Sequence, residues 1–94
     1  MIMSFADPQA ERIWNGLRSR KLPADIQPIA LRKLRMLNQA RVLTDLRVPP
    51  GNRLEALKGN RAGQWSIRIN EQWRVCFQWT FGGASNVEIV DYHD

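Results

Sequence analysis

The residues best suited to proton transfer stand together at the end of the chain, in the stretch EIVDYHD (88–94). This stretch contains the only histidine, His93, and the only tyrosine, Tyr92, directly after Asp91. Histidine has an ordinary pKa of ~6.5, so it can exchange a proton near neutral pH. His93 is therefore the candidate general acid, with Asp91 placed to orient its ring and Tyr92 offering a flat face for stacking. The alternative is that His93 is an ordinary solvated side chain.

A cationic segment precedes this acidic end of the chain. Between Gly51 and Arg74 there are two acidic residues, Glu55 and Glu71, and five cations: Arg53, Lys58, Arg61, Arg68 and Arg74. From Val75 onward there is no Lys or Arg. Most of the cations in the whole chain are Arg, whose planar, forked guanidinium suits phosphate groups. We therefore expect a phosphate-bearing partner to contact segment 51–74.

The composition fits one folded domain, residues 1–94. A hydrophobic content of 44% and four tryptophans argue against disorder, and the formal net charge is +5. Cys76 is the only cysteine, which excludes an intrachain disulfide, and no cluster of thiols and imidazoles is available for zinc. We expect no metal and no cofactor. No apolar stretch approaches the ~18 residues of a membrane span, so a cytoplasmic protein is expected.

The first half of the chain predicts two short helices. The apolar opening MIMSF (1–5) is suited to an edge strand. Asp7, followed by Pro8, fits the N-cap of a first helix whose apolar face extends to Leu17, and Asp25 fits the cap of a second helix. The second helix is expected to turn these cations away from the core: Arg32, Lys33, Arg35 and Arg41.

The second half predicts strands. After a turn at 49–51, apolar and polar residues alternate through 64–70 and 73–79, and a last strand covers 86–92. This order indicates an α+β fold, with two N-terminal helices packed on one face of a twisted, mostly antiparallel sheet of three to five strands. We expect at least three of the four tryptophans to be core residues.

The register of the predicted hairpin follows from its apolar faces. Keeping Ile67 with Val75 and Ile69 with Trp73 on the core side places Arg68 opposite Arg74 on the other side. Two like charges directly across a ladder cost roughly 0.2–1 kcal/mol. The pair is either two solvated surface arginines or part of an anion site.

The segment PPGNRLEALKGNRAGQWSIRINEQWRVCFQW (49–79), followed by VEIVDYH (87–93), resembles the HigB toxins of the RelE/ParE superfamily. The resemblance is strongest from Leu46 to His93. It implies a bacterial toxin of a type II toxin–antitoxin pair, similar to ribosome-dependent endoribonucleases that cut mRNA in the ribosomal A site. It also implies a HigA-like helix-turn-helix antitoxin as partner, contacts to rRNA, and contact with operator DNA only through that antitoxin.

The resemblance assigns roles residue by residue. Asp91, Tyr92 and His93 match the acidic, aromatic and histidine positions of the family's C-terminal motif, and Lys58 and Arg74 match its phosphate-facing cations. Some members have His at the position of Glu55, so the general base stays open here. Cleavage by the RNA's own 2′-hydroxyl needs a base, an acid and cations that stabilise the phosphorane.

Two other functions remain as alternatives. ParE relatives of the same fold block DNA gyrase by binding it, although they generally lack the C-terminal motif. A third hypothesis is a non-catalytic RNA- or ribosome-binding module, in which the arginines bind while Glu55 and His93 do nothing.

Overall fold

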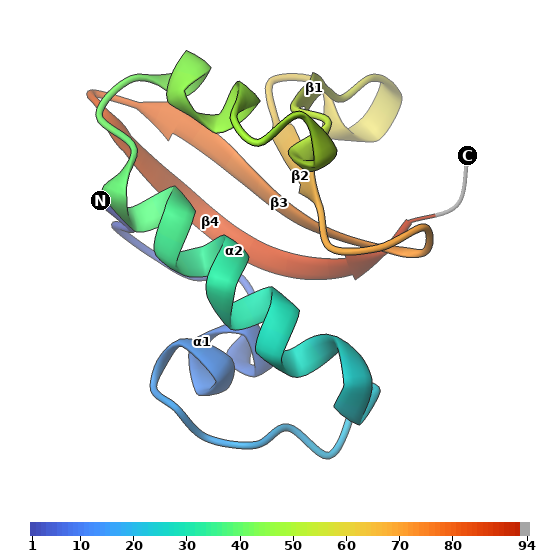
Figure 1. Cartoon of the computed structure of the whole chain (residues 1–94). Coiled ribbons are helices and arrows are strands. Elements are labelled where there is room, and N and C mark those ends of the chain that lie inside the picture. The colour runs from blue at the N-terminus through green and yellow to red at the C-terminus, as the bar shows by residue number, and fades with distance from the viewer. Residues whose placement is uncertain (93–94) are drawn as a thin grey trace.

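A computed structural model describes residues 1–92 and consists of two α-helices and a four-stranded antiparallel sheet (Figure 1). The helices are α1 (Pro8–Trp14) and α2 (Gln27–Gln39). The strands, in spatial order, are β1 (Glu55–Ala56), β2 (Trp65–Arg68), β3 (Trp73–Thr80) and β4 (Gly83–Asp91). Short 3-10 helices connect them: η1 (Ala24–Ile26), η2 (Leu43–Arg47), η3 (Pro50–Asn52) and η4 (Gly59–Arg61). The predicted α+β class and antiparallel sheet are confirmed.

The sheet has the predicted register. Ile67 lies opposite Val75, and Arg68 lies opposite Arg74. On the far side of β3, Val75 lies opposite Ile89 of β4. Because facing residues of antiparallel strands share a face, these apolar residues form one row and the arginines fall on the other side of the sheet.

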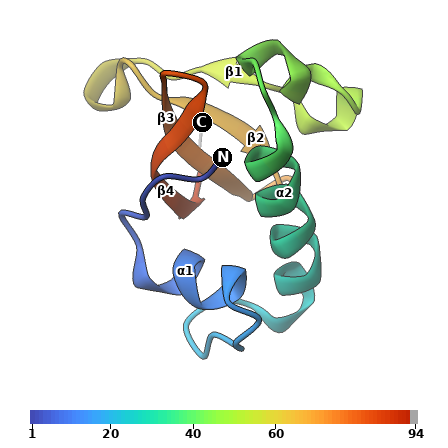
Figure 2. The same ribbon diagram turned by 90° about the vertical axis from the view of Figure 1, so that its left-hand side faces the viewer.

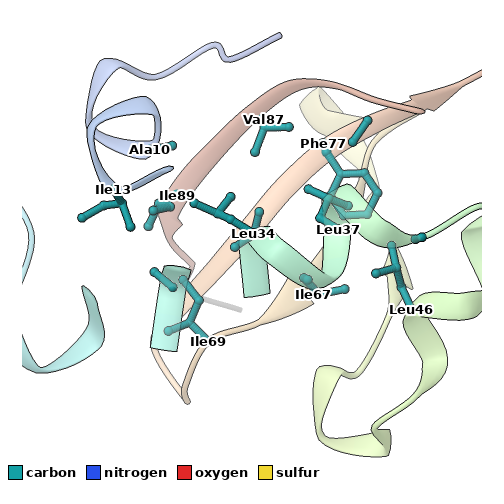
Figure 3. Packing of buried hydrophobic residues seen from close by; sticks show 14 of the residues in the cluster. Ala10, Ile13, Leu34, Leu37, Leu46, Ile67, Ile69, Phe77, Val87 and Ile89 are labelled. Carbon is teal, nitrogen blue, oxygen red and sulfur yellow. The ribbon is translucent and has the colours of Figure 1, made fainter. Parts of the chain in front are cut away.

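The core lies between the apolar face of the sheet and the helices. Helix α2 contacts β3 and β4, and α1 contacts β4. Figure 3 shows Leu34 and Leu37 of α2 reaching toward Phe77 and Val87 of the sheet, all fully buried. The four tryptophans are partly buried against this cluster, which agrees with a structural role for them: Trp14, Trp65, Trp73 and Trp79.

The N-terminal segment adds a short parallel border to the sheet. Ile2 and Phe5 form isolated bridges to Ala84 and Val87 of β4, so the expected edge strand is reduced to two points of pairing. Figure 2 shows this segment running alongside β4. It therefore covers part of the β4 edge.

Three details of the predicted helices are corrected. Asp7 caps α1 as expected, because its carboxylate accepts a hydrogen bond from the Gln9 amide at 2.9 Å. Asp25, however, lies inside η1, and α2 starts without a side-chain cap. Leu17 lies beyond the end of α1 and is 51% exposed. Lys33 is buried, because its ammonium donates to Asn52 Oδ1 at 2.5 Å.

Within residues 1–92, no helix is both long and apolar enough to span a membrane.

Candidate active site

Polar side chains gather on the face of the sheet that points away from α2. Glu55, Ser66, Cys76 and Glu88 lie opposite one another across the four strands. The arginine pair follows one step along the same face, since side chains of one face recur at every second residue. The alternation that buries the apolar row therefore also builds this polar row.

Arg74 is the centre of the polar face. Its side chain is only 14% exposed. The guanidinium donates to the buried Ser66 hydroxyl at 3.0 Å and to the backbone carbonyl of Arg53 at 3.3 Å, and lies 3.5 Å from a Glu55 carboxylate oxygen. Its Cζ also lies 5.6 Å from the centre of the Tyr92 ring. Four groups from separate segments thus fix one cation.

Glu55 reaches this cation from the edge strand. Arg53 takes a left-handed conformation (φ 45°) at the end of η3, and β1 begins two residues later. Pairing of Glu55 with Ser66 then aims the carboxylate across β2 toward Arg74. The Glu55 side chain remains 45% exposed, so a substrate can approach it from solvent.

The end of β4 separates two residues of the C-terminal motif. The Tyr92 amide donates to the carbonyl of Gln72 at 2.7 Å, and its ring lies against Arg74. Asp91 lies opposite Trp73 instead, on the core side of the sheet. Its carboxylate accepts a hydrogen bond from the side-chain amide of Gln72 at 3.1 Å. Asp91 and Arg74 therefore lie on opposite faces of the sheet. His93 lies outside the described residues.

The arginine pair avoids repulsion because its members turn to different carboxylates. Arg74 lies near Glu55, whereas Arg68 lies 3.9 Å from the exposed Glu71. Lys58 is exposed just before η4. The Arg53 side chain is also exposed, while its carbonyl rather than its guanidinium contacts Arg74.

Arg61 is paired within the fold. Its guanidinium forms an ion pair with Glu88, and this pairing raises the pKa of Arg61 above its ordinary value. It also donates to the Gln64 amide oxygen at 3.0 Å. Sequence analysis missed Glu88, which lies 27 residues away. The signal available was an acidic side chain between the apolar residues Val87 and Ile89 of the predicted last strand.

Cys76 lies beneath these charges and is completely buried. Burial raises the pKa of its thiol to about 11, with Arg61, Glu88, Arg74 and Glu55 all close enough to act on it. Two cations and two carboxylates therefore surround one point of the sheet. Within residues 1–92, no three His, Cys, Asp or Glu side chains are grouped to hold a metal ion.

Comparison with known proteins agrees with the predicted family. A family model for HigB-like toxins, described as the RelE-like toxin of the type II toxin–antitoxin system HigB, matches residues 3–93. Toxin HigB-1 of Vibrio cholerae is 44% identical over 87 residues, which are 92% of each chain. Endoribonuclease HigB of Proteus vulgaris is 44% identical over 41 residues, 44% of this chain and 45% of that protein.

The fold has a solved counterpart. A chain of the YoeB–YefM complex from Staphylococcus aureus superimposes with a TM-score of 0.61 over 100% of this chain and 99% of that chain, at 17% identity. At that identity the likeness concerns the fold alone. The family match and the relative from Vibrio cholerae confirm the resemblance drawn from segments 49–79 and 87–93: the chain belongs to the HigB-like family of RelE-like toxins of type II toxin–antitoxin systems.

Proposed function

We propose that this toxin is an endoribonuclease that cleaves mRNA on the ribosome and so stops translation. The observation that carries the proposal is the set of contacts around Arg74, which holds a guanidinium between the Glu55 carboxylate and the Tyr92 ring. A half-exposed carboxylate, a fixed cation and an aromatic face within one site suit an RNA phosphate and its neighbouring base.

The proposed reaction uses the RNA's own 2′-hydroxyl. Glu55 is the leading candidate to take the 2′-hydroxyl proton as the 2′-oxygen bonds to phosphorus. The bond from phosphorus to the 5′-oxygen then breaks, and His93 returns a proton to that oxygen. The products are a 2′,3′-cyclic phosphate and a 5′-hydroxyl.

The cations have unequal parts in this proposal. Arg74 and the exposed Lys58 stabilise the charge of the phosphorane, because Arg74 is held 3.5 Å from the Glu55 carboxylate that acts as the base and Lys58 is open to solvent. Arg61 is held by Glu88 and therefore supports the site rather than binding substrate. Arg53 and Arg68 contact the RNA backbone or rRNA next to the phosphate that is cleaved. Asp91 acts on the site through its neighbours, since it faces the other side of the sheet.

The proposed partner in the resting cell is a HigA-like helix-turn-helix antitoxin. Membership of a toxin–antitoxin family supports an antitoxin, and the structural counterpart is itself a toxin–antitoxin complex. Operator DNA would be contacted through the antitoxin only.

Expression of the toxin in bacteria, followed by primer extension on cellular messages, tests the proposal. We expect new cuts in translated messages, and no cuts when the purified toxin meets the same RNA without ribosomes. Arg74→Met and His93→Ala should remove the cuts, whereas Arg41→Met, a matched loss of an exposed arginine, should not. Full toxicity of both site variants would contradict the proposal, and inhibition of gyrase supercoiling without RNA cuts would favour the ParE-like alternative.

A further inference from the structure

An apolar groove lies between the end of α1 and the first turns of α2. After α1 ends at Trp14, the chain turns at Gly16, which has a φ of 79°, and returns toward α2 through segment 17–26. The groove has a volume of about 450 Å³. Its apolar lining comes from both helices and from the connection: Ile13, Leu17, Ala24, Pro28 and Leu31. Leu17 is half exposed there.

The groove has a cationic border. Arg18 lines it and also lines an adjacent hollow of about 610 Å³, together with Arg12 and Arg20. Arg12 fixes this border, because its Nε and Nη2 donate to the Arg18 carbonyl at 3.2 and 2.9 Å. Lys21 lies beside Arg12 and Arg20. Residues 9–26 contain four cations, Arg12, Arg18, Arg20 and Lys21, against two acidic residues, Glu11 and Asp25.

We infer that this groove binds an acidic, amphipathic helix of a protein partner. Apolar side chains on one face of such a helix would enter the groove, and carboxylates along its flanks would meet Arg18, Arg20 and Lys21. The apolar floor favours protein over RNA, because a phosphate backbone gains from the arginines but offers nothing to Leu17 and Leu31. The binding of an acidic helix does not depend on the proposed function. Only the identification of that helix as part of the antitoxin rests on it.

The groove is remote from the candidate active site. Both Figure 1 and Figure 2 show α1 and the connection after it at the opposite end of the molecule from β1, which carries Glu55. A change in the groove should therefore leave RNA cleavage intact. This separation allows binding and cleavage to be tested independently.

The binding test uses a synthetic helical peptide of about five turns, with leucines on one face and glutamates on the others. We expect it to bind the intact toxin in fluorescence anisotropy, and a peptide with lysines in place of the glutamates to bind at least about tenfold more weakly. Leu17→Asp and Arg18→Glu should each weaken binding at least about tenfold. Val42→Asp is the matched control, since Val42 is 55% exposed and lies outside the groove.

Equal binding of the two peptides, or unchanged binding by both groove variants, would overturn the inference. So would displacement of the acidic peptide by a short single-stranded RNA, which would show that the surface is a nucleic-acid site. Both groove variants should keep wild-type cleavage of mRNA on ribosomes. Loss of cleavage in folded groove variants would also overturn the inference, whereas absence of cleavage in the wild type would contradict the proposed function and leave the peptide result standing.

Discussion

Arg74→Met should separate the structural part of this arginine from its catalytic part. The methionine keeps most of the aliphatic stem, so the loss concerns the guanidinium. The buried Ser66 hydroxyl loses its donor, which costs about 1–3 kcal/mol. The half-exposed Glu55 pair adds at most about 1 kcal/mol, and the contact with Tyr92 about 0.5–1 kcal/mol. We expect the free energy of unfolding to fall by about 2–3 kcal/mol.

For a domain of this size, that loss corresponds to a melting temperature lower by roughly 8–24 °C. Far-UV circular dichroism during heating measures it. At a temperature where the variant is still folded, mRNA cleavage on ribosomes should fall about 10²–10³-fold, the usual effect of removing one donor that stabilises a transition-state charge. Arg74→Lys is the companion variant, because it keeps the charge but loses the planar guanidinium, whose Nη1 contacts both Ser66 and Glu55.

Two results would refute this reasoning. An unchanged melting temperature for Arg74→Met would mean that the contacts to Ser66, Glu55 and Tyr92 do not hold the site together. A folded variant that cleaves at the wild-type rate would mean that Arg74 does not stabilise the phosphorane.

Three further predictions concern the groups around the site and the buried lysine. Asn52→Leu should lower the free energy of unfolding, measured by urea titration, by about 3 kcal/mol, because it leaves the buried Lys33 ammonium without its partner. Adding Lys33→Met to the same chain should restore part of this loss. Additive losses would contradict the pairing. The raised pKa of Cys76 means that the folded state keeps its proton longer than the unfolded state, so stability should decline between about pH 9 and 11. Cys76→Ala should remove up to about 3 kcal/mol of that decline, and an identical pH profile in the variant would show that Cys76 is not the source. Glu88→Gln should lower stability by about 1 kcal/mol in chemical unfolding, and no change would mean that the Arg61 pair contributes nothing.

Local pattern was sufficient for much of the fold. The alternation of apolar residues determined the facing of Ile67 with Val75, and with it the facing of Arg68 with Arg74. Asp7 was identified as a cap because capping involves residues only two apart. Both features depend on neighbours in sequence or on a short hairpin.

Two features that the sequence did not predict depend on partners distant in sequence. Lys33 was expected in solvent because nothing near it in sequence shows that Asn52, 19 residues later, accepts its hydrogen bond. The Arg61 pair with Glu88 likewise depends on how β3 and β4 align, and that alignment contains an irregularity between Cys76 and Gln78.

The C-terminal strand was ambiguous for a different reason. Both of its faces are apolar, so the sequence did not decide which way Tyr92 points, and the structure places it against Arg74. Grouping Asp91 with Tyr92 ignored the alternation that puts neighbouring residues of a strand on opposite faces. The catalytic and RNA-binding roles of all the predicted site residues stay predictions.

The most direct test of the central claim replaces one nucleotide of the message. After the cut site on a ribosome-bound mRNA has been mapped, the nucleotide on its 5′ side is made 2′-deoxy, which removes the hydroxyl proposed to attack the phosphate. The account predicts that the ribose message is cut to leave a 2′,3′-cyclic phosphate and a 5′-hydroxyl, and that the deoxy message stays intact at that position. Cleavage of the deoxy message at the same position and rate would contradict it.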